Sequence, residues 1–163
     1  MTDTIKRKHQ RAYMECAYAF ARCSDANRSK VGCIIVKDTR IISEGYNGLP
    51  AALDGPLEDE NNVTRPEVRH AEENALKKLI RNHETSIGAS MFITHAPCYK
   101  CSLDIVDAKI DAVFFAEFKT RFDGLRYLKN NRIRVYHLTE KSINRVDFNY
   151  IDDEENRQLM EKL

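Results

Sequence analysis

The sequence predicts an α/β fold in which helices cover both faces of one sheet. Short β-branched runs alternate with segments of helical periodicity over most of the chain. The expected strands are residues 31–36, 40–46, 89–94, 111–116 and 133–138, and the expected helices are residues 4–22, 69–82, 98–108 and 122–130. Strands that alternate with helices in this way form a sheet with two buried faces. The 163 residues suit one such domain, so we expect a single domain over residues 1–163.

The first helix and the first two strands come from clear local patterns. Apolar side chains recur at helical spacing at Ile5, Ala12, Cys16, Ala17 and Phe20, and the basic run "KRKHQR" belongs to the solvated face. "VGCIIV" and "RIISEGY" are β-branched runs separated by "KDT", which predicts a hairpin. Residues 47–68 then hold three of the four prolines and two glycines. A connection of that length is usually functional or disordered.

The C-terminal half repeats the alternation of strand and helix. "ASMFIT" and "DAVFFA" predict strands, "FDGLRYLKN" a short helix and "IRVYHL" a last strand. The tail "DDEENRQLMEKL" is typical of a charged terminal helix. The sequence assigns no role to the last 25 or so residues.

Composition excludes several classes of protein. The chain has 26 basic and 25 acidic side chains, a net charge of +1, which disfavours a broad nucleic-acid-binding surface. No apolar run reaches the roughly 18 residues of a membrane span, and "MTDTIKRKHQR" lacks the apolar core of a signal peptide. We therefore expect a cytoplasmic enzyme or binding domain with neither nucleic acid nor membrane as a partner.

The five cysteines divide into two groups. An odd number without a signal peptide makes a disulfide framework improbable. Cys98 and Cys101 form a C-x-x-C pair, which indicates a metal-binding or redox-active site. The thiols of Cys16, Cys23 and Cys33 lie in or beside apolar stretches, and we expect them to be buried and inert.

The motif "PCYKC" supplies two metal ligands on one helix. Residues at positions i and i+3 share a helix face, so the sulfurs of Cys98 and Cys101 can reach one ion. Pro97 suits the entry to a helix, and a helix N-terminus lowers the pKa of a thiol. His70, at the start of the helix in "RHAEENAL", offers a third donor. One histidine and two cysteines match a zinc site whose fourth position is open to water.

Glu72 adds a proton carrier to this set. It lies two residues after His70, which suits a hydrogen bond to water on the metal better than coordination of the metal. H-x-E followed by P-C-x-x-C is the signature of zinc-dependent nucleobase deaminases. The alternative is a structural zinc site, which needs a fourth protein ligand such as His83 or His95.

The sequence resembles the cytidine deaminase superfamily and, within it, the deoxycytidylate (dCMP) deaminases, over about residues 10–138. The matching segments are "KVGCIIV", "RIISEGYNGLP", "VTRPEVRHAEENAL", "GASMFITHAPCYKC" and "DGLRYLKNNRIRVYHL". "GYNG", followed after one residue by proline, distinguishes dCMP deaminases from relatives that share only the zinc signature. The resemblance implies a three-layer α/β/α fold with a central mixed five-stranded sheet.

The resemblance also implies an activity, the hydrolysis of dCMP to dUMP and ammonia, which feeds thymidylate synthesis. Zinc would be held by His70, Cys98 and Cys101, and Glu72 would carry the proton from water to the ring nitrogen and then to the leaving amine. The residues implied in substrate binding are Asn47 on the deoxyribose, Arg28, Lys119 and Arg121 on the 5′-phosphate, and Ala71.

Many members of this family are hexamers activated by dCTP and inhibited by dTTP, which bind with magnesium. The resemblance places such an effector site at Gly45, Tyr46, Asn47 and Gly48, and it implies a homo-oligomer, a hexamer. Some members bind a second, structural zinc through cysteine and histidine in the connection before His70. Residues 47–69 contain neither residue type, so we expect one zinc per chain.

Two alternatives to a dCMP deaminase remain open from the sequence. One is a deaminase of a 5-substituted dCMP or of a base in RNA, although the near-neutral charge and "GYNG" disfavour RNA. The other is a non-catalytic zinc module that senses nucleotides. The presence of Glu72 disfavours that module, because it has no need of a proton carrier.

Overall fold

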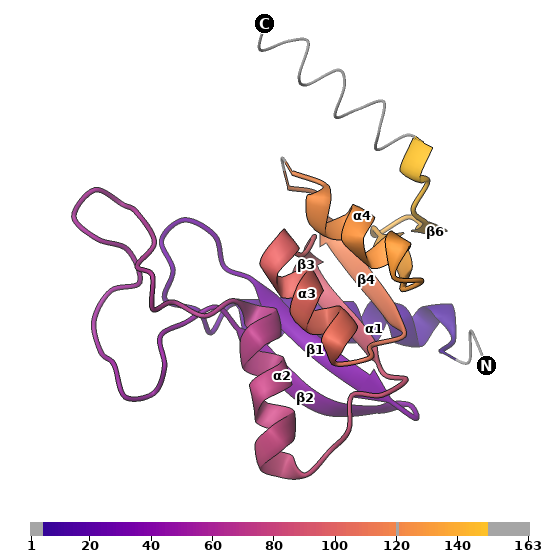
Figure 1. Cartoon of the computed structure of the whole chain (residues 1–163), viewed down its shortest axis with the longest axis horizontal. Coiled ribbons are helices and arrows are strands. Elements are labelled where there is room, and N and C mark those ends of the chain that lie inside the picture. Colours follow the sequence, from indigo (N-terminus) through magenta and orange to yellow (C-terminus); the bar gives the residue numbers. More distant parts are fainter. Residues whose placement is uncertain (1–4, 120, 150–163) are drawn as a thin grey trace, which may run out of the picture.

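The computed structural model, which describes residues 5–119 and 121–149, has helices on both faces of one mixed sheet (Figure 1). Its elements in chain order are α1 (Arg7–Ala21), β1 (Gly32–Lys37), β2 (Arg40–Tyr46), α2 (Ala71–Asn82), β3 (Ser90–His95), α3 (Tyr99–Asp107), β4 (Ala112–Glu117), α4 (Asp123–Asn130), β5 (Arg134–Leu138) and β6 (Ile143–Arg145). The predicted three-layer α/β/α fold is confirmed. The predicted C-terminal helix lies outside the described residues.

The sheet has six strands in the order β2-β1-β3-β4-β5-β6, one more than the five that were predicted. β1 is antiparallel to both β2 and β3, whereas β3, β4 and β5 run parallel. β6 pairs antiparallel with β5, with Leu138 opposite Ile143. It has three residues, of which none is fully buried, so it leaves no apolar pattern in the sequence.

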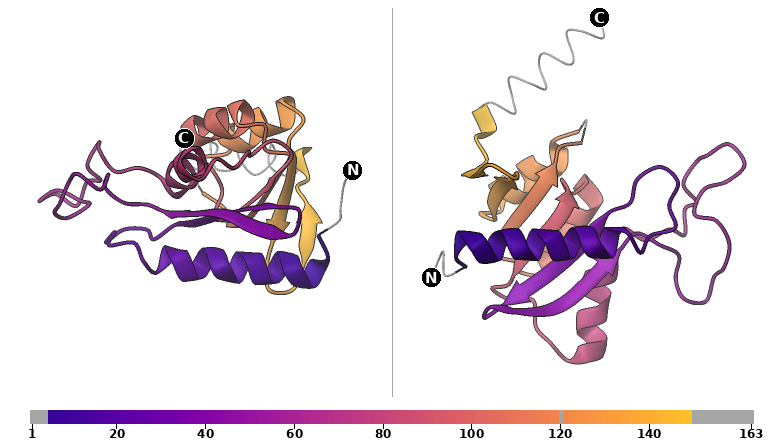
Figure 2. Two further views of the ribbon diagram at one scale, coloured as in Figure 1. Left: turned by 90° about the horizontal axis from the view of Figure 1, so that it is seen from below. Right: turned by 180° about the vertical axis from the view of Figure 1, so that it is seen from behind.

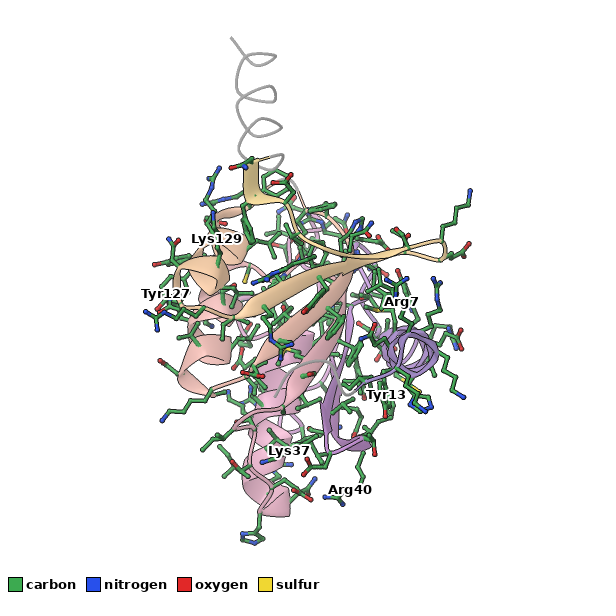
Figure 3. All side chains as sticks on the ribbon, turned by 90° about the vertical axis from the view of Figure 1, so that its right-hand side faces the viewer. Arg7, Tyr13, Lys37, Arg40, Tyr127 and Lys129 are labelled. Atoms are coloured by element: carbon green, nitrogen blue, oxygen red, sulfur yellow. The ribbon has the colours of Figure 1, made fainter. Side chains whose placement is uncertain are left out.

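Two hydrophobic cores lie on opposite faces of the sheet. Side chains alternate between them along β1: Cys33 and Ile35 face the core under α2, α3 and α4, whereas Ile34 and Val36 face α1. Figure 2 shows α1 alone on its face, opposite α2 and α3. Figure 3 likewise places Tyr13 of α1 and Tyr127 of α4 on opposite sides of the sheet. Both sheet faces are therefore buried, as the alternation of strands and helices predicted.

The predicted apolar face of α1 is only partly right. Its buried residues are Gln10, Met14, Ala17 and Ala21, whereas Ala12 is exposed. The face is set by close packing on β1, because a Cβ at Gly32 would lie 1.9 Å from the carbonyl oxygen of Ala17.

The three cysteines outside the C-x-x-C pair also differ from one another. Cys33 is buried in the core as expected, Cys16 is half-buried, and Cys23 is exposed. The prediction was wrong for Cys23, because that residue follows the last turn of α1, where the chain turns back toward solvent. Among the described residues, no helix is long and apolar enough to cross a membrane.

Two glycines fix the helices that carry the candidate site. A Cβ at Gly45 would lie 2.3 Å from the carbonyl oxygen of Ala71 and 2.6 Å from the amide nitrogen of Ala75, so the first turns of α2 rest directly on β2. A Cβ at Gly124 would lie 2.4 Å from the carbonyl oxygen of Pro97, so α4 rests equally closely on the entry to α3. Backbone contact of this kind leaves no room for a side chain.

We predict that Gly45→Ala lowers the free energy of unfolding by about 1–3 kcal/mol, because the added methyl overlaps the backbone of α2. Gly48→Ala is the matched control. Its Cβ would meet only the Tyr46 ring, at 3.7 Å, so its stability should stay within about 0.5 kcal/mol of wild type. Urea unfolding measures both, and equal stability of the two variants would contradict the packing assigned to Gly45.

Candidate metal centre and adjoining pocket

Three potential metal ligands meet at the starts of α2 and α3. His70 Nδ1 lies 3.5 Å from Cys98 Sγ and 3.3 Å from Cys101 Sγ, and the three ligand atoms all lie within 4.8 Å of one another. In the described part of the chain this is the one cluster of at least three such groups. The structure therefore brings together the three residues that the sequence predicted as a zinc set.

Local backbone geometry explains this convergence. His70 and Cys98 are the N-cap residues of α2 and α3, with extended backbones (ψ of 160° and 168°), and their side chains meet at the starts of the two helices. The Cys101 amide donates to Cys98 Sγ (3.5 Å), which ties the two sulfurs to one helix start. Two helix N-termini therefore direct partial positive charge at the cluster, an environment that favours thiolates.

The charge state of the cluster suits a metal cation. A hydrogen bond from the Cys101 thiol, together with the nearby His70, lowers the pKa of Cys98 to about 3. The same thiol pair raises the pKa of Cys101, because one proton is shared between two sulfurs. A divalent cation replaces that proton and lets both sulfurs ionise. One imidazole and two thiolates are a donor set that zinc prefers, so the residues fit zinc.

Neither histidine considered as a fourth ligand belongs to the cluster. His83 is exposed and caps the C-terminal end of α2, the end opposite His70. The His95 ring lies 3.1 Å from Thr94 Oγ1 through Nδ1 and 3.2 Å from Glu117 Oε2 through Nε2. Within the described residues the set is limited to three donors, the number found in catalytic rather than structural zinc sites.

Glu72 lies beside this cluster in the first turn of α2. Its side chain is 3% exposed, and burial raises the pKa of its carboxyl group, with Lys119 and His70 opposing that shift. A carboxyl group with a raised pKa exchanges a proton more readily near neutral pH than an exposed one. The environment of Glu72 therefore suits a proton carrier.

A pocket of about 280 Å³ adjoins the cluster and includes most of the predicted substrate-binding residues. Its lining residues are Ala26, Arg28, Ser29, Val31, Asn47, Leu57, Glu58, Thr64, Val68, His70, Ala71, Glu72 and Lys119. They come from the α1–β1 loop, the end of β2, the 47–69 connection, the start of α2 and the segment after β4. Figure 1 shows how far the 47–69 connection extends from the sheet.

Asn47 supports the α1–β1 loop as well as lining the pocket. Its Oδ1 accepts from the Val31 amide (2.9 Å), and its Nδ2 donates to the Ser29 carbonyl (2.8 Å). The Ser24 hydroxyl donates to the Asn47 carbonyl (2.8 Å). These hydrogen bonds use one Nδ2–H and one Oδ1 lone pair of Asn47. The other Nδ2–H and the other lone pair can bond a ligand, so Asn47 can join the loop to a bound molecule.

The three predicted phosphate ligands do not share one location. Arg28 and Lys119 line the pocket, and no ion pair forms at either side chain within residues 5–119 and 121–149. Arg121 does not line the pocket and pairs with Asp123 at 2.8 Å, with 82% of its side chain exposed. Two unpaired cations in one pocket favour an anionic ligand.

Sequence reasoning missed Leu57 and Glu58, which are both 4% exposed and line the pocket. They come from the middle of the connection, which was predicted only as irregular. The signal was weak, because Glu58 lies in the acidic run "LEDE", where a solvated surface is the usual outcome. The isolated bridge between Glu58 and Thr64 shows that this part of the connection is folded against the pocket.

A second, basic pocket lies on the other side of the "GYNG" segment. Gly45, Tyr46 and Gly48 line it, together with four basic residues, Arg69, Lys77, Lys78 and Arg81. Asn47, the remaining residue of the segment, lines the first pocket instead. Gly48 and Arg69 join the two regions through reciprocal backbone hydrogen bonds of 3.0 and 2.9 Å.

The family model described as the cytidine and deoxycytidylate deaminase zinc-binding region matches residues 7–117, more than half of the chain. The chain belongs to this family. The match spans all three residues of the cluster and Glu72. The match to this family model, which covers the zinc-dependent deaminase signature, therefore confirms the resemblance drawn from the sequence.

Several relatives of this chain are deoxycytidylate deaminases. It is 38% identical to the deoxycytidylate deaminase of Mycobacterium phage D29, over 63% of this chain and 90% of the relative. It is 31% identical to the deoxycytidylate deaminase of Saccharomyces cerevisiae, over 76% of this chain but only 42% of that protein's length. A crystal structure of the dCMP deaminase from cyanophage S-TIM5, in complex with dCMP and dUMP, matches with a TM-score of 0.80 and 35% identity, over 82% of this chain and 98% of that one.

We predict that wild-type protein binds close to one equivalent of zinc and that Cys101→Ala loses most of it, because the cluster then lacks one of its three donors. Metal analysis by mass spectrometry after gel filtration measures both. Cys23→Ala, which removes an exposed thiol outside the cluster, should keep the wild-type content. Two equivalents in wild type, or full content in Cys101→Ala, would contradict the site.

Proposed function

We propose that this protein is a deoxycytidylate deaminase that hydrolyses dCMP to dUMP and ammonia. The observation that carries the proposal is one pocket that contains His70 of the three-donor cluster, the buried carboxyl group of Glu72 and two cations, Arg28 and Lys119, that form no ion pair among the described residues. This arrangement combines a site for a metal-activated water, a proton carrier and a receptor for a phosphate.

Glu72 performs the proton transfers in this proposal. His70, Cys98 and Cys101 would hold a zinc ion, which would supply a water of lowered pKa. The Glu72 carboxylate takes one proton from the attacking water and gives it to the ring nitrogen. It then takes the second proton from the new hydroxyl group on the ring carbon and gives it to the departing amine, so that ammonia leaves and dUMP remains. Because burial raises the pKa of Glu72, the protonated carboxyl group is less costly to form between these steps.

Recognition of the nucleotide falls to the α1–β1 loop and the segment after β4. The guanidinium of Arg28 and the ammonium of Lys119 bind the 5′-phosphate, since both line the pocket unpaired in the described part of the chain. Asn47 bonds the deoxyribose through the amide capacity that the loop leaves unused. Ala71, which is 0% exposed, closes the pocket beside Glu72 with a methyl group. Arg121 remains a predicted phosphate ligand without such support, because its guanidinium pairs with Asp123.

We predict that the purified protein deaminates dCMP and leaves CMP, deoxycytidine and dCTP essentially unchanged. The fall in ultraviolet absorbance on loss of the amino group measures all four reactions. A preference for deoxycytidine would contradict the phosphate site. Silence on all four would favour another nucleobase or the non-catalytic module.

Glu72→Ala should lower kcat on dCMP by roughly a hundred-fold or more while zinc content stays at the wild-type value. This variant links the activity to the pocket. Glu15→Ala, which removes an exposed carboxyl group on α1, is the control and should retain full turnover. Near-normal turnover by Glu72→Ala would refute its assignment as the proton carrier.

We infer a second ligand site in the basic pocket at Gly45, Tyr46 and Gly48. Its four cations suit the triphosphate of a dCTP or dTTP effector bound with magnesium. Lys77 and Arg69 already contact Glu73, and Lys78 contacts Glu44, whereas Arg81 forms no ion pair within the described residues. Arg81 is therefore the side chain most available to a new anion. A hexameric assembly remains part of this proposal.

We predict that dTTP with magnesium inhibits the wild type and that Arg81→Ala raises the dTTP concentration needed for half-inhibition by roughly ten-fold, since it removes one charge-assisted contact. Arg7→Ala, which removes an exposed arginine on α1 (Figure 3), is the control and should match wild type. Inhibition curves at fixed dCMP measure the effect. Equal curves for Arg81→Ala and wild type would exclude Arg81 from the effector site.

A further inference from the structure

Glu58 is a buried carboxylate in the wall of the pocket, and neither the metal cluster nor the proton transfers use it. Its side chain is 4% exposed. The backbone amide of Asn27 donates to both of its oxygens, at 3.1 Å each, and the amide of Arg28 donates to Oε1 at 3.3 Å. The Glu58 carboxylate thus links the 47–69 connection to the backbone of Asn27 and Arg28 in the α1–β1 loop.

A small hairpin delivers Glu58 to this position. The Arg65 amide donates to the Leu57 carbonyl (2.9 Å), and the Asp59 amide donates to the Val63 carbonyl (2.8 Å). The side chain of Asp59 closes the hairpin by accepting from the amides of Asn61 and Val63, at 2.9 Å each. Leu57, next to Glu58, is buried in the pocket wall. The carboxylate is therefore held by a folded unit rather than by a freely moving loop.

A negative charge in this position needs a reason, because the proposed substrate brings a phosphate of the same sign into the same pocket. Burying a carboxylate is costly unless hydrogen bonds compensate the charge, and here the backbone amides of Asn27 and Arg28 do so. Those amides belong to a loop between α1 and β1, outside any helix or strand, so no helix or sheet partner accepts from them, and the Glu58 carboxylate does. The charge of Glu58 is thus directed at the loop backbone.

We propose that Glu58 is a positioning residue for phosphate recognition: it holds the Asn27–Arg28 turn so that the guanidinium of Arg28 faces the 5′-phosphate of the nucleotide. This inference rests on the proposed function. Glu58 acts through Arg28 and does not touch the phosphate itself. It therefore matters for ligands that carry the phosphate and not for the nucleoside that lacks it.

The test compares dCMP with deoxycytidine in wild type, Glu58→Gln, Arg28→Ala and the double variant. Glu58→Gln should raise the KM for dCMP by roughly ten-fold, the effect of one lost charge-assisted hydrogen bond, and leave kcat within about two-fold. The inhibition constant of deoxycytidine, used as a competitive inhibitor, should stay unchanged. Because Glu58 acts through Arg28, the double variant should have the KM of Arg28→Ala alone.

Glu60→Gln is the matched control, since it neutralises an exposed carboxylate two residues further along the same hairpin and should match wild type. Circular dichroism and zinc content check that each variant is folded. If Glu58→Gln does not fold, Glu58→Asp, which withdraws the carboxylate by one methylene, should show the same selective rise in KM.

Three outcomes would overturn the proposal. An unchanged KM for dCMP in a folded Glu58 variant, equal weakening of dCMP and deoxycytidine, or additive effects in the double variant would each do so while the proposed function stands. A wild-type protein without turnover of dCMP would instead remove the proposed function, and the role of Glu58 with it.

Discussion

The convergence of two helix N-termini on one sulfur–imidazole cluster is the constraint on which the rest of the structure depends. A metal site tolerates ligand displacements of only a few tenths of an ångström. His70 begins α2 and Cys98 begins α3, so the relative position of two whole helices sets the distance between ligands. Gly45 holds the first of these helices against β2, and Gly124 holds the entry to the second against α4. The same residues that pack the helices therefore also set the distances between the metal ligands.

The α1–β1 loop depends on a different kind of support. It crosses the pocket without strand partners, and side chains from distant segments satisfy its backbone. Asn47 bonds Ser29 and Val31, whereas Glu58 bonds Asn27 and Arg28. These two supports come from either end of a twelve-residue stretch of the chain, the start and the middle of the 47–69 connection. The connection extends far from the sheet (Figure 1), and Leu57, Glu58, Thr64 and Val68 return from it to line the pocket.

Much of this could be predicted from the sequence, because the deciding signals are local. Apolar runs revealed β1, β3 and β4, and the spacing of Cys98 and Cys101 revealed their common helix face. The H-x-E motif was enough to identify His70 as the third ligand beside that cysteine pair. β6 was missed because its three residues, one half-buried and two exposed, pair with β5 through backbone hydrogen bonds, which leave no hydrophobic pattern in the sequence.

The role of the connection could not be predicted for a related reason. Glu58 is buried by tertiary contacts with a loop thirty residues earlier, whereas Asp59 and Glu60, which follow it in sequence, are exposed acids. Burial of Ala12 was wrongly expected because the contact of Ala17 and Ala21 with Gly32 fixes which face of α1 meets the sheet, and Ala12 lies off that face. In both cases the outcome depends on which surfaces meet in three dimensions rather than on the pattern within one segment.

The two pockets are separated by a very short length of backbone, and this determines how ligands in them can influence each other. Asn47 faces the first pocket, and Gly48, the next residue, faces the second. Gly48 is bonded twice to Arg69, which faces the second pocket, and the next residue is His70 of the metal cluster. A ligand in the basic pocket can change affinity for dCMP only if it binds two arrangements of this backbone with different affinity. Any such rearrangement of Gly48 or Arg69 must also displace Asn47 or His70, because one peptide bond joins each pair. Regulation through this pocket would therefore act directly on Asn47, the proposed sugar contact, and on His70, the proposed metal ligand, without a longer path through the core.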